Sequence, residues 1–139
     1  MRLPADATLI VVGVPGGTGD RRAAAATAAL IDAWRREALP VIEARAPEAG
    51  AFDDGRLEAR LDALGATTLV LCGGESAVER SARDAEALGF HAFIVRDACW
   101  RDGPSQSLGQ AGTVVDAATA LAAAALAKAR QRRRERRDR

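Results

Sequence analysis

The sequence is poor in several residue types on which enzymes commonly rely. It has no tyrosine, one histidine (His91) and one lysine (Lys128) among 139 residues. A single histidine excludes a metal site built from several histidines, and any Ser-His or Cys-His pair would have to include His91. The absence of tyrosine excludes the Tyr-Lys pair of short-chain reductases.

Cysteines and long apolar runs are also scarce. Cys72 and Cys99 are the only cysteines, and both lie beside expected strands, which favours a reduced, cytoplasmic protein. There is no run of eighteen strongly apolar residues, and the N-terminus lacks the layout of a signal peptide. We therefore expect one cytoplasmic domain without membrane contact, metal or cofactor.

Charge is distributed unevenly along the chain. The last twelve residues, KARQRRRERRDR, hold eight basic and two acidic side chains (8 − 2 = +6), which leaves 12 − 17 = −5 for the rest. We expect an α/β domain over residues 1–127 and a basic tail over residues 128–139. This basic tail either contacts a polyanion or continues the last helix in solvent, where positive charge suits the helix dipole.

Short apolar runs alternate with amphipathic or alanine-rich stretches. This alternation predicts a three-layer, Rossmann-like α/β fold: a parallel sheet of about five strands in the order 2-1-3-4-5, covered by helices on both faces. Asp20 is the expected N-cap of the first helix, and Gly65 the expected C-cap of the second. The expected strands are residues 8–13, 39–44, 68–72, 92–95 and 113–115, and the expected helices are 21–37, 55–64, 76–88 and a last one from 116.

Two glycine-rich turns follow the first and third expected strands. In a sheet of this order both turns open at the switch point, where ligands of such folds bind. The candidate ligand-binding residues are Gly13, Gly16, Gly17, Gly73, Gly74 and Ser76.

The first of these turns, GVPGGTGD, resembles the GxxGxxG loops of some nicotinamide-binding reductases. Asp20 places negative charge where a phosphate would lie, and Arg21 and Arg22 offset it only in part. A nucleotide-binding module that uses residues 13–19 therefore stays an alternative to a plain connector.

The longest expected loop covers residues 97–112. Trp100 lies near its start, and an exposed tryptophan there predicts an interface anchor or a lid over a pocket.

Residues 76–99, SAVERSARDAEALGFHAFIVRDAC, resemble the cysteine-hydrolase (isochorismatase-like) family, whose corresponding helix begins T-N-x-C-V-E-S-T-A-R-D-A. A weaker resemblance covers residues 38–45, 50–73 and 112–126. The resemblance implies an α/β sheet of the type derived above and frequently an oligomer. The residues that follow the pattern are Val78, Glu79, Ser81, Ala82, Arg83, Asp84 and Ala85.

The resemblance also implies that the family's chemistry is lost. Family hydrolases use a cysteine nucleophile, an aspartate base and an orienting lysine. The matching positions hold Ala77 and Gly13, and no lysine lies near residues 45–48. Cys72 is the alternative nucleophile, but it has no basic partner to lower its pKa, and Glu75 would tend to raise it.

The sequence is compatible with three functions. The first is a catalytically degenerate domain that acts as a structural, oligomerising or ligand-binding subunit of a homo-oligomer or of a complex with another protein. The second is a small hydrolase of C–N or ester bonds that uses Cys72. The third is the nucleotide-binding module described above.

Overall fold

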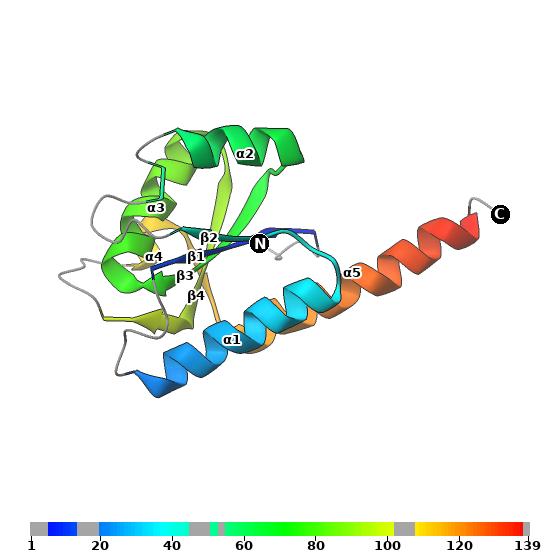
Figure 1. Cartoon of the computed structure of the whole chain (residues 1–139), viewed down its shortest axis with the longest axis horizontal. Helices are drawn as coiled ribbons and strands as arrows, with labels where there is room; N and C mark the ends of the chain where they lie inside the picture. Colours follow the sequence, from blue (N-terminus) through cyan, green and yellow to red (C-terminus); the bar gives the residue numbers. More distant parts are fainter. Residues whose placement is uncertain (1–5, 14–19, 45–50, 53–54, 102–107, 138–139) are drawn as a thin grey trace.

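The computed structural model describes residues 6–13, 20–44, 51–52, 55–101 and 108–137. These residues form one parallel sheet in the order β2-β1-β3-β4-β5, with helices on both faces (Figure 1). The fold class and the strand order predicted from the sequence are confirmed. The strands are β1 (Thr8–Val12), β2 (Val41–Ala44), β3 (Thr68–Gly74), β4 (His91–Trp100) and β5 (Thr113–Val115); the helices are α1 (Arg21–Arg36), α2 (Arg56–Leu64), α3 (Glu75–Ala87), α4 (Leu108–Ala111) and α5 (Ala117–Arg137).

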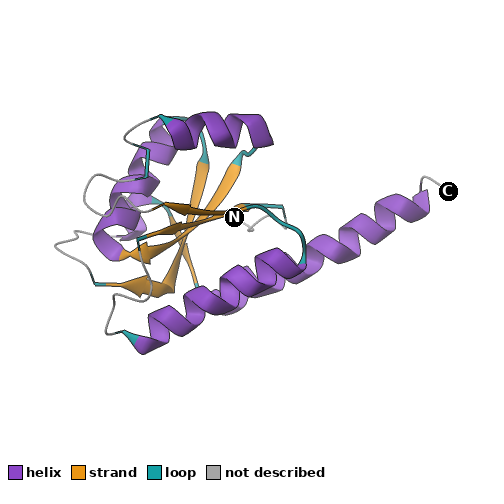
Figure 2. Ribbon diagram, in the orientation of Figure 1, coloured by secondary structure: helices purple, strands orange, loops and turns teal. Residues whose placement is uncertain are grey.

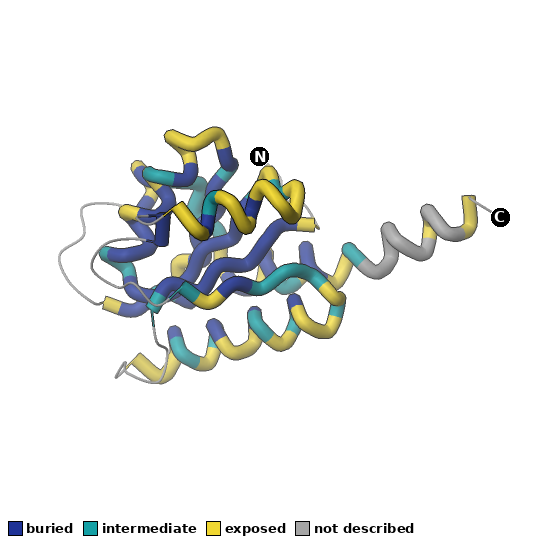
Figure 3. Tube along the Cα trace, turned by 45° about the horizontal axis from the view of Figure 1, so that its top comes forward, coloured by how far each residue is buried: buried dark blue, intermediate teal, exposed yellow. Residues whose placement is uncertain are grey.

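The sheet separates two apolar layers. Helices α2, α3 and α4 cover one face, and α1 and α5 cover the other (Figure 2). Residues of β1 alternate between the layers because successive side chains of a strand point to opposite faces. Ile10 packs with Leu71 and Val78 in one layer, and Leu9 packs with Trp34 in the other. All five residues of β1 are buried, as expected for a strand covered on both faces (Figure 3).

Local capping explains where the helices begin and end. The Asp20 side chain accepts a hydrogen bond from the Ala23 N–H at 3.0 Å, which confirms the predicted N-cap of α1. Gly65 ends α2 in the left-handed conformation with φ +68°, which confirms the predicted C-cap. The indole N–H of Trp34 donates to the carbonyl of Ala7 at 2.8 Å and so fixes α1 beside the start of β1.

Strand β4 is longer than the sequence pattern indicated. It pairs with β3 up to Gly74 and Trp100, after a register shift that follows Leu71. The prediction of a continuous loop over residues 97–112 is therefore wrong at both described ends, since 97–100 are strand and 108–111 form α4. The exposed pair Arg96 and Asp97 interrupts the apolar run, and the bulge breaks the simple alternation that marks a strand.

Helix α5 begins against the sheet and then leaves it. Asp97 Oδ1 accepts a hydrogen bond from the Ala117 N–H at 2.7 Å and so fixes the first turn of α5 to β4. Buried alanines from Ala117 to Ala124 pack in the layer that contains α1. Beyond them the helix projects from the body of the protein (Figure 1). Within the described part of the chain, no helix has the length and apolar character needed to cross a membrane.

Candidate functional site

The carboxyl ends of β1 and β3 lie side by side at the switch point of the sheet. Val12 pairs with Gly73, and a Cβ placed on Gly13 would lie 3.8 Å from the backbone nitrogen of Gly74. Ser76 follows on the first turn of α3, where it is partly exposed. The structure therefore brings four of the predicted ligand-binding residues to one edge of the sheet.

The other two predicted residues, Gly16 and Gly17, lie outside the described residues. The same holds for most of the loop on which a nucleotide-binding module would depend.

The glycine at position 73 has a clear packing role. Its φ is +129°, and a Cβ there would lie 1.9 Å from the carbonyl oxygen of Val12. Only glycine permits the two strands to approach this closely at this point. The Gly73-Gly74 pair is also buried and belongs to β3, so it continues the strand that was expected to end at Cys72.

Trp100 covers the switch point. A Cβ on Gly13 would lie 3.4 Å from Cζ2 of the Trp100 ring, and Trp100 is 6% exposed. The prediction that Trp100 is an exposed interface anchor on a loop is wrong, because β4 continues to this residue and buries it. The alternative prediction, a lid, agrees with the position of the ring over Gly13.

Cys72 lies fully buried on β3, in the layer that holds α1 and α5. Burial raises the pKa of its thiol to about 12, and a hydrogen bond with the Thr27 side chain offsets this only in part. At neutral pH the side chain is therefore a neutral thiol. Desolvation is the dominant cause of the raised pKa of Cys72, whereas the sequence had suggested the charge of Glu75.

The single histidine lies at the opposite end of the sheet from Cys72. His91 begins β4 and pairs with Thr68, four positions before Cys72 on β3. Four residues of strand correspond to about 13 Å. His91 stacks on Phe93 instead, with ring centroids 4.6 Å apart. A Cys-His pair that involves Cys72 is therefore excluded by topology.

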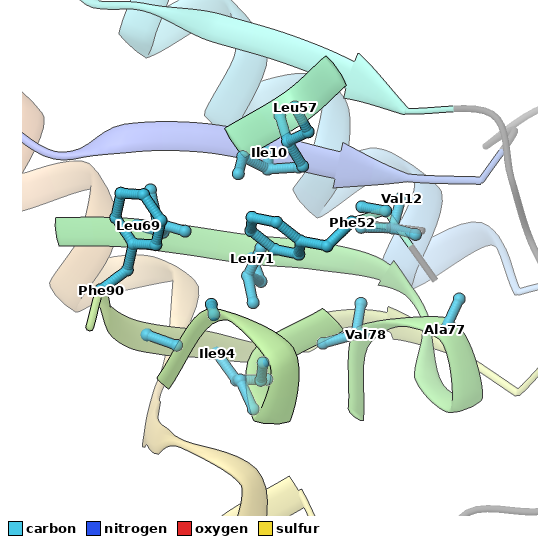
Figure 4. Close-up of a cluster of buried hydrophobic side chains, with 14 of the residues drawn as sticks. Ile10, Val12, Phe52, Leu57, Leu69, Leu71, Ala77, Val78, Phe90 and Ile94 are labelled. Carbon is cyan, nitrogen blue, oxygen red and sulfur yellow. The ribbon is translucent and has the colours of Figure 1, made fainter. Parts of the chain in front are cut away.

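Ala77 lies on the first turn of α3, with its side chain directed toward the sheet beside that of Val78 (Figure 4). It is 3% exposed and belongs to the core layer that contains Phe52. On the same helix, Ser81 is fully buried, and its Oγ accepts a hydrogen bond from the Ala51 N–H at 3.0 Å. This face of α3 is packed core.

Two further residues of α3 that follow the family pattern, Glu79 and Arg83, form an ion pair. Arg83 Nη2 lies 3.1 Å from Glu79 Oε1, one helical turn away, and Glu79 is 8% exposed. Arg83, with 48% of its side chain exposed, is thus one member of an ion pair at the surface of α3. Within the described ranges, no group of three or more His, Cys, Asp or Glu side chains is arranged to hold a metal ion.

The start of α1 bears on the nucleotide alternative. The carboxylate of Asp20 already accepts a hydrogen bond from the Ala23 N–H, one of the first-turn donors that a phosphate would use. Its negative charge also opposes an anion at this helix end. The described part of this turn therefore favours a capped helix.

Comparison with known proteins finds similarity to isochorismatase-family proteins in both sequence and fold. The sheet order and flanking helices define an isochorismatase-like α/β fold. Residues 45–111, just under half of the chain, match the family model described as the isochorismatase domain. The resemblance seen in the sequence is thus confirmed. Among curated proteins, no match is found.

Solved structures with this fold come from several bacteria. An isochorismatase family protein from Burkholderia thailandensis is 20% identical, with a TM-score of 0.73 over 88% of this chain and 97% of its own. A putative isochorismatase-family hydrolase from Chromobacterium violaceum is 24% identical, with a TM-score of 0.70 over 90% and 97%. The YcaC gene product of Escherichia coli, described as an octameric hydrolase of unknown specificity, is 18% identical, with a TM-score of 0.63 over 87% and 80%.

The strand position of Trp100 and the contact made by Thr27 at this edge were not foreseen. Trp100 was expected in a loop, although its aromatic ring is typical of a strand and extending the apolar run across Arg96 and Asp97 would have placed it there. Thr27 is buried on α1, and its hydroxyl donates to the carbonyl of Ala98 at 3.2 Å. A lone threonine in an alanine-rich helix was the only available signal for that contact.

Proposed function

We propose that the protein is a non-catalytic domain of the isochorismatase-like fold that acts as an assembly or binding subunit. The observation that carries the proposal is Ala77. The resemblance aligns this position with the family nucleophile, and a buried methyl group stands there in the core of the protein. A methyl group has no lone pair with which to attack a carbonyl carbon.

The remaining chemistry of the site supports the same proposal. The resemblance aligns Gly13 with the family aspartate, and the only lysine is in the basic tail. Cys72, the alternative nucleophile, is a buried neutral thiol with a pKa of about 12. A thiol must be ionised to act as a nucleophile, so the hydrolase alternative has little support from this geometry.

Assembly is a role that requires no nucleophile at this edge of the sheet. We propose that the chain works in the cytoplasm as a homo-oligomer or as a subunit beside a partner protein. One structural neighbour is described as octameric, and the fold is shared with it. Any small ligand is expected at the carboxyl edge, beside Gly13, Gly74 and Ser76.

Two measurements on the purified full chain test this proposal. Native mass spectrometry should show more than one subunit, or a copurified partner or ligand. Hydrolysis of a panel of amides and activated esters should be equal for the wild type and the Cys72→Ala variant. A strictly monomeric chain whose turnover is lost in Cys72→Ala would favour the hydrolase alternative.

A further inference from the structure

The basic tail continues α5 to Arg137, and this part of the helix projects from the folded body (Figure 1). Among the described side chains of α5, Ala124 is the last buried one, and Leu126, two positions later, is 53% exposed. The helix continues to Arg137. Thirteen residues beyond Ala124 correspond to about 20 Å of helix. The core of the domain therefore does not account for this segment (Figure 1).

The sequence of the basic tail does not favour an isolated helix. Four pairs of basic residues are spaced four apart within the bounds of α5: 128 and 132, 130 and 134, 132 and 136, 133 and 137. Like charges at this spacing destabilise a helix, and Glu135, three positions after Arg132, is the one acidic residue within these bounds. Counter-charge on a partner would add stability to a helix of this composition.

Composition restricts the class of partner. Residues 127–139 contain no apolar side chain larger than alanine, so the segment has no amphipathic face for a lipid bilayer or a coiled coil. It also lacks aromatic rings, on which single-stranded bases would stack. Seven of its eight basic residues are arginine, whose planar fork suits phosphate.

Charge density points to a duplex. The basic tail has a net charge of +6, since eight basic side chains oppose two acidic ones. Duplex nucleic acid presents about one phosphate per 1.7 Å, and its major groove admits an α-helix. The rest of the chain has a net charge of −5 (12 − 17), which repels a polyanion and confines contact to the basic tail.

We propose that the basic tail docks on the phosphate backbone of double-stranded nucleic acid without reading its sequence. The exposed residues Arg133, Arg136 and Arg137 lie in the contact, and the acidic body stays on the solvent side. This inference is independent of whether the body is catalytic.

Fluorescence anisotropy with a labelled 20-base-pair DNA duplex tests the proposal on the full chain. The variant Arg133→Gln/Arg137→Gln removes two charges from the basic tail. The control Arg60→Gln/Arg101→Gln removes two exposed positive charges from the body, so the two variants have the same net charge. None of these side chains is in the core, so both variants should fold.

The expected result separates the two variants by their salt dependence. At 0.1 M salt the tail variant should bind the duplex up to about tenfold more weakly than the wild type. The slope of log K against log[salt] should become shallower by about 2. The body variant should keep the wild-type slope. The helical signal of the wild type at 222 nm should persist to higher temperature when unlabelled duplex is added.

Three results would overturn the proposal. The first is equal weakening by both variants, and the second is no binding of the duplex at 50 mM salt. The third is equal displacement of the labelled duplex by poly-L-glutamate and by unlabelled duplex at the same concentration of negative charge. That result would assign the basic tail to an acidic protein surface.

Discussion

The ring of Trp100 lies over Gly13 at the carboxyl edge of the sheet, with Cζ2 3.4 Å from the position of a Cβ on Gly13. Trp100 ends β4 and Gly13 follows β1, so an aromatic side chain lies over the switch point between the first and third strands. In an open sheet of this order that point is where ligands bind. The position of the Trp100 ring therefore bears directly on whether this edge binds a ligand.

Replacing Trp100 should show how much stability this cover contributes. We expect Trp100→Ala to lower the free energy of unfolding by about 3 kcal/mol or more, because it removes a buried ring and leaves a cavity. Trp100→Phe keeps an aromatic ring and should lose less than half as much. Denaturant unfolding measures both, and an Ala variant as stable as the wild type would contradict the observed burial.

The close approach at Gly73 predicts a steep loss of stability on substitution. Gly73→Ala should lower the free energy of unfolding by at least about 3 kcal/mol, because its Cβ would meet the Val12 carbonyl at a φ that disfavours L-residues. Gly89→Ala is the matched control, since Gly89 has φ +96° but no atom within 4 Å of an added Cβ. That variant should lose about 1–2 kcal/mol. Equal losses in the two variants would remove the packing role of Gly73.

Burial of Cys72 predicts a specific pH dependence. The folded thiol has a pKa of about 12 and the unfolded thiol one near 9.0, so the unfolded state releases its proton first as the pH rises. The stability that this group contributes is complete below pH 9 and is lost between about pH 9 and 12. At pH 10 the loss should be about 1.4 kcal/mol.

Comparison of two cysteine variants isolates that effect. Cys72→Ala should lack the alkaline loss when unfolding is measured at pH 7 and pH 10. Cys99→Ala keeps Cys72 and should show the same loss as the wild type. Iodoacetamide should also leave Cys72 unlabelled in the native state at pH 8, and labelling there would contradict a buried neutral thiol.

Asp97 links the long strand β4 to helix α5. Its Oδ1 accepts a hydrogen bond from the Ala117 N–H at 2.7 Å. We expect Asp97→Ala to lower the free energy of unfolding by about 1 kcal/mol, because it leaves a first-turn donor of α5 without this partner. Asp97→Asn keeps an acceptor and should lose only a few tenths of a kcal/mol. If the Asn variant lost as much as the Ala variant, charge rather than hydrogen bonding would explain the contact.

The fold could be predicted because its strands and helices have simple periodicity. Uniform burial of β1 requires a continuous apolar run, and the spacing of Leu30 and Trp34 on α1 matches one helical face. The Asp20 and Gly65 caps followed from local backbone chemistry, which depends on few neighbours.

The carboxyl edge was harder to predict because its geometry depends on contacts between distant residues. The end of β4 follows a register shift, and the exposed Arg96 and Asp97 hide a strand that continues to Trp100. The cover over Gly13 joins residues 87 positions apart (100 − 13), and no local pattern encodes it. The high pKa of Cys72 likewise arises from burial by α1, which only the tertiary structure gives.

Trapping of an acyl-enzyme tests the central claim most directly. The full chain is mixed with an activated ester, stopped in acid at short times, digested, and analysed by mass spectrometry for acyl groups on each cysteine. If the protein is non-catalytic, the peptide that contains Cys72 stays unmodified at every time. An acyl adduct on Cys72 that forms and then decays as product appears would contradict the account.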